Sequence, residues 1–217
     1  MSGVAQPLWR GGRTEQLEYT KKVLLVGDGA VGKTSLVRRY VHDLFADRYI
    51  ATIGTKTTRK EFKLEYEAED VCVTLDLGIW DILGQKGIEK AHQLYFEGAH
   101  AYIVVCDLTR ADTLAAVPEW AARVHELCGK VPGVLAANKV DLVEDREARK
   151  GEVTALADGL GVKWFWNSAK TGENVEMLFY ELGTKICEPI VTQFAQAKAE
   201  AAGRAGRPKK KFAGLRR

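Results

Sequence analysis

The sequence has few of the residues that build cross-linked or metal-bound domains. Its four cysteines are scattered, mostly in apolar stretches, and no two of them have C-x-x-C spacing. The four histidines show no metal-ligand spacing either. We therefore expect the cysteines to be small core residues in a reducing compartment, and we exclude a disulfide scaffold and a zinc site. These cysteines are Cys72, Cys106, Cys128 and Cys187.

Long apolar runs are also missing. Residues 1–20 contain no apolar stretch of the kind found in a signal peptide. No other segment approaches the roughly 20 apolar residues that cross a bilayer. We expect a cytoplasmic protein that is at most peripheral at a membrane surface.

The net charge is small, but basic residues are concentrated near the C-terminal end of the sequence. The formal net charge is only +3, yet Lys198 to Arg217 carries +7 and leaves −4 for the rest. We expect residues 188–217 to form a basic extension that is helical over Val191–Ala202, after Pro189, and then disordered. This extension contacts an anionic membrane, or it contacts a nucleic acid or acidic protein, or it only keeps the protein soluble.

A glycine-rich run is the most informative feature that is present. The sequence GDGAVGKT at residues 27–34 follows an apolar stretch and precedes apolar residues at helical spacing. This order of strand, loop and helix fits a Walker A loop, in which backbone N–H groups surround the phosphates of a nucleotide. In such a loop Lys33 reaches the β- and γ-phosphates, and the Thr34 hydroxyl is a ligand of Mg²⁺. We expect nucleotide contacts from Gly29, Ala30, Val31, Gly32, Lys33, Thr34 and Ser35.

Two further segments indicate which base is bound. The sequence NKVD at residues 138–141 follows an apolar run, so it lies where a strand should end. A carboxylate at Asp141 can accept hydrogen bonds from N1 and N2 of guanine, whereas adenine offers no such pair of donors. The backbone N–H groups of residues 168–170, after another strand-like stretch, can meet guanine O6. The sequence therefore predicts a guanine site formed by Asn138, Lys139, Asp141, Ser168, Ala169 and Lys170.

Together these motifs resemble those of the Ras superfamily of small GTPases, and within it most closely the Rab family. The resemblance covers roughly residues 21–187, and it includes the sequences YIATIG at 49–54, IWDILGQ at 79–85 and SAKTGENV at 168–175. It implies roles for individual residues. Thr52 closes over Mg²⁺ and contacts the γ-phosphate, and Asp81 holds the ion through water. The expected catalytic group is Gln85, which orients the attacking water, with Lys33, Thr52 and Gly84, whose N–H senses the γ-phosphate.

The resemblance also implies a molecular switch that acts as a monomer. GTP with Mg²⁺ orders the loops at 46–55 and 82–96, and loss of the γ-phosphate releases them. Effectors and regulators then bind these loops. We expect slow intrinsic hydrolysis, which an arginine from a partner accelerates by about 10³ to 10⁵. Gly29 leaves room for that arginine, and Phe45 lies across the guanine face.

Several positions depart from the family pattern. Ile82 and Leu83 stand where the family has small residues. They restrict the peptide motion that switching needs, or they exclude water from the site and stiffen the second switch loop, or they simply pack beneath it. The stretch between Thr52 and Asp81 is several residues longer than usual, which predicts a long hairpin turning at 65–70, with a bulge at 77–78.

The two ends of the chain differ from the family as well. The sequence ends without the cysteines that receive prenyl groups, and Ser2 replaces the glycine that myristoylation requires, so no lipid anchor is expected. These departures indicate a divergent Rab-like member, of a kind expected in archaea.

The alternation of apolar runs and helical stretches predicts an α/β fold. We expect a doubly wound, mostly parallel six-stranded sheet with one antiparallel edge strand and helices on both faces. The single domain spans residues 21–187, between an N-terminal extension at 1–20 and the basic extension at 188–217. Expected strands are 22–26, 56–64, 71–80, 101–106, 133–137 and 162–166, and expected helices are 33–44, 87–96, 113–128, 146–160 and 175–187.

Three functions remain open from the sequence. The first is a GTP-hydrolysing switch, which retention of Gln85, Thr52 and Gly29 favours. The second is a scaffold that holds guanine nucleotide with little hydrolysis, which the bulky residues 82–83 favour. The third is a nucleic-acid-associated GTPase that uses the basic tail.

Overall fold

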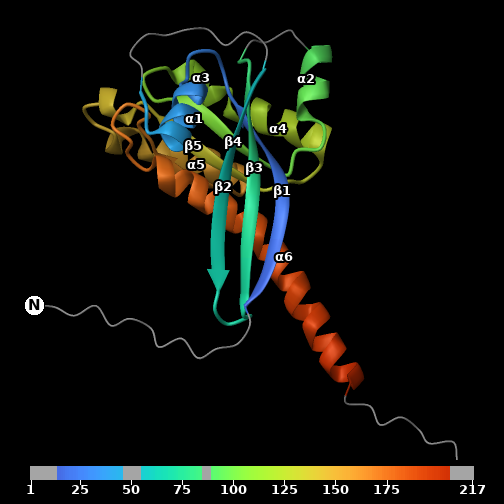
Figure 1. Ribbon diagram of the computed structural model, residues 1–217. Helices are drawn as coiled ribbons and strands as arrows, with labels where there is room; N and C mark the ends of the chain where they lie inside the picture. Colours follow the sequence, from blue (N-terminus) through green and yellow to red (C-terminus); the bar gives the residue numbers. More distant parts are fainter. Residues whose placement is uncertain (1–13, 46–54, 85–88, 206–217) are drawn as a thin grey trace, which may run out of the picture.

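One six-stranded sheet forms the centre of the protein (Figure 1). The computed structural model describes residues 14–45, 55–84 and 89–205. The strand order is β2-β3-β1-β4-β5-β6. Only the pairing of β2 with β3 is antiparallel, so β2 is the antiparallel edge strand that the sequence predicts. The strands are β1 (Glu15–Val26), β2 (Thr55–Tyr66), β3 (Val71–Ile82), β4 (Ala101–Asp107), β5 (Gly133–Asn138) and β6 (Lys163–Trp166).

Helices cover both faces of the sheet, and each face has its own apolar core. On one face α1 and α6 pack against side chains such as Val23, Leu75 and Ile103. On the other face α2, α3, α4 and α5 pack against side chains such as Leu24 and Val104. Because successive strand residues point to opposite faces, the central strands must be apolar at every position, and every residue of β4 and β5 is buried. The helices are α1 (Lys33–His42), α2 (Glu89–Phe96), α3 (Ala111–Ala115), α4 (Val117–Cys128), α5 (Lys150–Leu160) and α6 (Val175–Ala205).

Three strands and one helix extend well beyond the rest of the domain. β1 begins at Glu15, seven residues before the expected start, and its first half pairs in parallel with β3. α6 has 31 residues and continues through Pro189 instead of ending at Cys187. It runs along the extended strands (Figure 1), where Val191, Ile190 and Phe194 join the core on that face. We call this part, residues 15–21, 60–77 and 188–198, the stalk.

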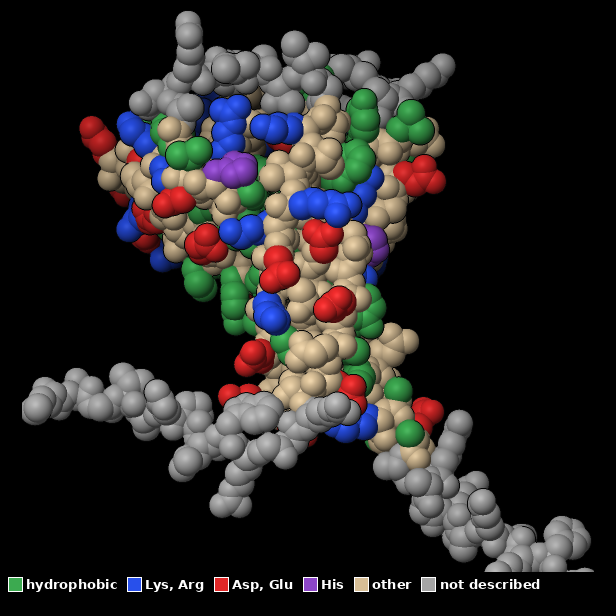
Figure 2. Space-filling model, in the orientation of Figure 1, with side chains coloured by type: hydrophobic (Ala, Val, Ile, Leu, Met, Phe, Trp, Pro, Cys, Tyr) green, Lys and Arg blue, Asp and Glu red, His purple; other side chains and the backbone are tan. Residues whose placement is uncertain are grey.

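The stalk has one apolar and one polar face. Val71, Val73 and Leu75 of β3 are buried on the side that faces the α1 and α6 core. The visible face over β2 and β3 carries interspersed acidic and basic side chains (Figure 2). Arg59 of β2 and Asp76 of β3 form an exposed ion pair. This alternation explains how a hairpin can project from the domain without exposing a second apolar surface.

Boundaries of three further expected helices were wrong. α1 ends at His42, not at residue 44, because Asp43 adopts a left-handed conformation with φ of 52° and caps the helix. The expected helix 113–128 is divided into α3 and α4, since Pro118 at the start of α4 lacks the N–H that a continuous helix needs. The helix expected at 146–160 is α5, which begins only at Lys150, after a short 3₁₀ turn at Glu147–Arg149.

The bulge expected at residues 77–78 was also wrong. The pairing of β2 with β3 runs without interruption from Thr55 opposite Ile82 to Tyr66 opposite Val71. The extra length is therefore taken up as regular strand. The hairpin turns after Tyr66, where Asp70 has a φ of 54°.

The cysteines lie in or near the core, where the sequence predicts them. Cys72, Cys106 and Cys187 are buried, Cys128 is half-buried, and all four are free thiols. Among the described residues, no helix is both long enough and apolar enough to cross a bilayer.

Candidate functional site: a phosphate loop and its neighbours

The loop after β1 has the backbone that a phosphate-binding loop requires. Gly27 and Gly32 have φ of 137° and 101°, which side-chain-bearing residues rarely adopt. A Cβ at Gly27 would lie 2.2 Å from the carbonyl oxygen of Val105, and one at Gly32 would lie 2.3 Å from Nδ2 of Asn138. The two glycines therefore hold the loop against β4 and β5, at the carboxyl end of the sheet. Ala30 also has a positive φ, of 62°.

Lys33, the first residue of α1, is folded back over this loop. Its side chain is only 7% exposed, and its ammonium donates hydrogen bonds of 2.7 Å to the carbonyls of Gly27 and Asp28. Burial lowers the pKa of Lys33 to about 8, although the carboxylates of Asp81 and Asp28 act in the opposite direction. The ammonium is thus held at the mouth of the loop, where it can meet an anionic ligand.

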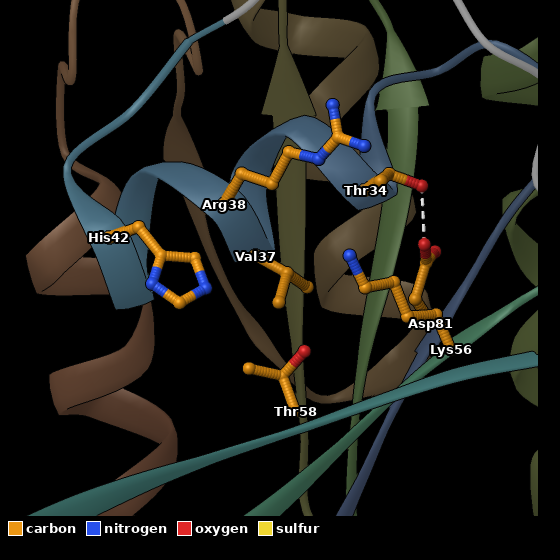
Figure 3. Close-up of a pocket in the computed structure, with 7 residues that line it drawn as sticks. All are labelled: Thr34, Val37, Arg38, His42, Lys56, Thr58 and Asp81. Carbon is orange, nitrogen blue, oxygen red and sulfur yellow. Dashed lines mark hydrogen bonds between the residues drawn. The ribbon is translucent and has the colours of Figure 1, made fainter.

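Thr34 and Asp81 meet beside the loop. The Thr34 hydroxyl donates a hydrogen bond to Oδ2 of Asp81, which is 2% exposed at the end of β3. Figure 3 shows this pair at the edge of a pocket of about 240 Å³, counting space open to solvent, with Lys56 pointing toward it. The other residues that line the pocket are Val37, Arg38, His42 and Thr58.

These oxygen atoms fit Mg²⁺ better than a transition metal. In the described chain no group of three or more His, Cys, Asp or Glu side chains could hold a metal ion. Mg²⁺ commonly takes only one or two protein oxygen ligands and completes its octahedron with water and substrate phosphates. The hydroxyl of Thr34 and the carboxylate of Asp81 suit that pattern.

The second predicted switch segment begins in contact with the phosphate loop. A Cβ at Gly84 would lie 2.4 Å from the backbone carbon of Asp28 and 2.6 Å from the carbonyl oxygen of Gly27. Only a glycine allows this approach. Gly29 is different, since among the described atoms a Cβ there would meet the carbonyl oxygen of Gly84 alone, at an ordinary 3.7 Å.

The predicted guanine segments lie together at the next strand ends. Asn138 is 2% exposed, and its Nδ2 donates to the carbonyl of Val31 at 2.8 Å, which ties β5 to the phosphate loop. Its Oδ1 accepts from the N–H of Ala169 at 3.3 Å. The buried Ser168 hydroxyl donates to Oδ1 of Asp141 at 2.6 Å. The Asp141 side chain is exposed, and the hydrogen bond from Ser168 orients it.

The remaining predicted residues have simpler surroundings. Ser35 is half-buried in the first turn of α1, and Lys170 is exposed. Phe45 is half-buried and packs against the core that α1 and α6 share. Ile82 is 1% exposed in the other core, while Leu83 is half-buried. Thr52 and Gln85 lie outside the described residues.

Sequence reasoning missed Asp107, which links the two halves of the site. Its carboxylate, 1% exposed at the end of β4, contacts Nζ of Lys139 at 2.6 Å and Nε of Arg110 at 3.2 Å. Arg110 in turn donates to the carbonyl of Gly29 at 2.8 Å. Burial opposes the ionisation of Asp107, but hydrogen bonds from Lys139 and Thr109 outweigh it and lower the pKa of the carboxyl. An acidic residue directly after an all-apolar strand was the available signal.

A second contact outside the expected set also holds the phosphate loop. The indole N–H of Trp120, on α4, donates to Oδ1 of Asp28 at 2.8 Å. The motifs say nothing of this residue, because a tryptophan in an amphipathic helix reads as core.

Comparison with known proteins agrees with this geometry. The profile of the Ras family matches residues 22–188. The chain belongs to the Ras family. This Ras-family protein is 33% identical to the Ras-related protein RABD2a of Arabidopsis thaliana, over 82% of its own length and 85% of the relative's. It is 31% identical to the GTP-binding protein ypt1 of Schizosaccharomyces pombe, over 88% and 92% of the two chains. The human Ras-related protein Rab-30 is 32% identical over 79% and 82%.

These relatives confirm the Rab-like assignment made from the motifs. The Ras-family chain is a Rab-like small GTPase, that is, a GTP-binding switch that hydrolyses GTP to GDP. Its fold is the six-stranded α/β fold that the resemblance implied.

Proposed function

We propose that the γ-phosphate of GTP draws residues 46–55 and 82–96 together into one surface that effectors and regulators bind, and that hydrolysis separates them. The observation that carries this proposal is the backbone approach of Gly84 to Gly27 and Asp28, which leaves no room for a Cβ. An amide placed there can respond to a phosphate held by the loop. The switch works as a monomer in the cytoplasm, or peripherally at a membrane.

The individual roles follow from position. Lys33 binds the β- and γ-phosphates, and backbone N–H groups of residues 29–35 surround them. Asn138 and Lys139 hold the base loops in place, Asp141 accepts from guanine N1 and N2, and residues 168–170 meet O6. Phe45 covers the guanine ring.

Thr34, Asp81 through water, and Thr52 would hold a Mg²⁺ ion. That ion, when bound, neutralises charge that develops on the β- and γ-phosphates. The hydrogen bond between Thr34 and Asp81 supports the pairing, because it brings both oxygen groups to one point beside Lys33. Gln85 orients the attacking water, and the N–H of Gly84 contacts the γ-phosphate.

Hydrolysis is slow in the isolated protein. In this class of site catalysis is mainly positioning and charge stabilisation, and an arginine from a partner adds about 10³ to 10⁵ in rate. The absence of a side chain at Gly29 supports such an arrangement, since a Cβ there would fill space beside the carbonyl oxygen of Gly84, at 3.7 Å.

The basic residues after 198 are a candidate contact for an anionic membrane surface. Each basic residue near such a surface contributes about 1 kcal/mol, so the attachment is weak and sensitive to salt. Cosedimentation with vesicles of phosphatidylserine should show binding at low salt that is lost at high salt. Absence of binding at low salt would dismiss this contact.

Hydrogen exchange tests the switch directly. Peptides covering 46–55 and 82–96 should exchange more slowly with a non-hydrolysable GTP analogue and Mg²⁺ than with GDP. Gly84→Ala should bind both nucleotides but lose the protection of 82–96, because its Cβ collides with the Asp28 backbone. Gly159→Ala, where a Cβ meets no atom of the described residues within 4 Å, is the matched control. Equal exchange with both nucleotides in the unaltered protein would refute the switch.

A further inference from the structure

Arg39 joins two parts of the molecule that the nucleotide motifs do not connect. Its Nε donates to the carbonyl of Ala169 at 2.9 Å, and its Nη2 donates to the carbonyl of Lys170 at 2.6 Å. Its Nη1 donates to Oδ1 of Asp43 at 3.0 Å and to the Asp43 carbonyl at 3.4 Å. All three nitrogens of one guanidinium are therefore engaged.

The two ends of this contact are functionally different. Ala169 and Lys170 belong to the loop assigned to guanine O6, which lies 130 residues away along the chain. Asp43 is the left-handed residue that ends α1, two residues before Phe45 and three before the first switch segment, 46–55. Arg39 thus lies between the guanine loop and the entry to that segment.

The contact differs from ordinary capping of a helix end. Basic side chains in the last turn of a helix commonly bond their own terminal carbonyls. Here the two shortest bonds go to the distant loop, and the Arg39 side chain is 19% exposed while that of Asp43 is 91% exposed. A guanidinium suits this role, because its rigid fork can reach several acceptors at once, which a lysine ammonium does less well.

We propose that Arg39 is a positioning residue that sets the lifetime of bound nucleotide by clamping the guanine loop to the end of α1. The clamp rests on the proposed function, because it acts on the guanine site described above.

The rate of release of fluorescent mant-GDP from the full chain, in Mg²⁺ and with excess GDP, tests the clamp. Arg39→Ala should release mant-GDP about tenfold faster, because two charge-assisted hydrogen bonds to the loop are lost, while association changes little. Arg39→Lys should be intermediate, and it serves if the alanine variant does not fold. Arg59→Ala, which removes the exposed ion pair of Arg59 with Asp76 of the stalk, is the matched control and should release at the rate of the unaltered protein.

A double-mutant cycle separates a clamp from two unrelated contacts. Asp43→Ala should raise the release rate by less than Arg39→Ala, and the double variant should be no faster than Arg39→Ala alone. Single-turnover GTP hydrolysis by the loaded variants should remain at the unaltered rate, which general misfolding would not allow.

Either of two results would overturn the clamp. One is a release rate in Arg39→Ala equal to that in Arg59→Ala, and the other is independent multiplication of the Arg39 and Asp43 effects. If the unaltered protein bound no mant-GDP at all, the proposed function would fail instead, so the two failures are distinguishable.

Discussion

At the scale of single residues, the site depends on buried charges that are held by backbone carbonyls and by one another. Lys33 and Arg110 both donate to carbonyls of the phosphate loop, and Asp107 connects Arg110 to Lys139. A buried ion pair contributes little net stability by itself, but removing one partner leaves the other uncompensated. Replacement of Asp107 therefore destabilises the protein by more than its ion pairs stabilise it.

We expect Asp107→Asn to lower the free energy of unfolding at pH 7 by about 1–3 kcal/mol, since the charged partners lose a buried acceptor. Because the folded pKa of Asp107 lies below its ordinary value of about 3.9, its stabilisation is complete above that pH and is lost as the pH falls through the lowered pKa. Urea unfolding from pH 7 to pH 3 measures this. The difference between the two proteins should shrink below about pH 4, and a constant difference across the range would contradict the assignment.

At the scale of elements, β3 explains one departure from the family pattern. The strand continues to Ile82, whose side chain is 1% exposed in the core beneath α2 and α4. The reading in which this bulky residue packs under the loop is the one that the burial supports. Leu83 is only half-buried and lies next to Gly84. Substitution of Leu83 therefore distinguishes packing beneath the loop from a direct effect on the second switch segment.

We expect Ile82→Ala to lower the free energy of unfolding by about 2–5 kcal/mol, because it leaves a cavity in a closed core. Leu83→Ala should cost about 1 kcal/mol or less, since its side chain is already partly in water. If both residues are packing residues, single-turnover GTP hydrolysis should stay within about twofold of the unaltered rate. A tenfold change in Leu83→Ala would instead favour a direct effect on the second switch segment.

The elements also show what a sequence can and cannot reveal. The central strands β4 and β5 were predicted almost to the residue, because full burial requires uninterrupted apolar runs. The first half of β1 was missed, since Glu15 to Lys21 is largely polar and is held by pairing with β3. The phosphate and guanine motifs were recognisable because their chemistry fixes residue types at short spacing. Arg39 acts through carbonyls 130 residues away along the chain, which no local pattern encodes. Asp107 was marked only by its place at the end of an apolar run.

At the scale of the whole molecule, the stalk makes residues 15–21 and 188–198 part of the fold. Pro189 removes one backbone hydrogen bond inside α6, and the sequence therefore predicted a break there. The helix continues because Ile190, Val191 and Phe194 pack against the extended strands. Lys198 adds a hydrogen bond of 3.2 Å to the carbonyl of Glu69, next to the hairpin turn.

We expect removal of residues 188–217 to lower the free energy of unfolding by about 3–5 kcal/mol, because three apolar side chains of α6 leave the stalk core. Removal of residues 206–217 alone is the control, and it should leave the thermal midpoint unchanged. Thermal unfolding of both truncated chains, loaded with GDP, measures the effect. Equal midpoints for the two truncations would show that the stalk contacts do not stabilise the domain.

The length of α6 has a geometric consequence for attachment. At 1.5 Å per residue its 31 residues span on the order of 45 Å, and the helix leads away from the end of the sheet that carries Lys33 and Thr34 (Figure 1). A molecule or surface that is attached after Ala205 is thereby held away from the nucleotide site by a rigid helix rather than by a flexible linker. The nucleotide-binding loops would stay accessible to proteins that approach from the opposite end of the domain.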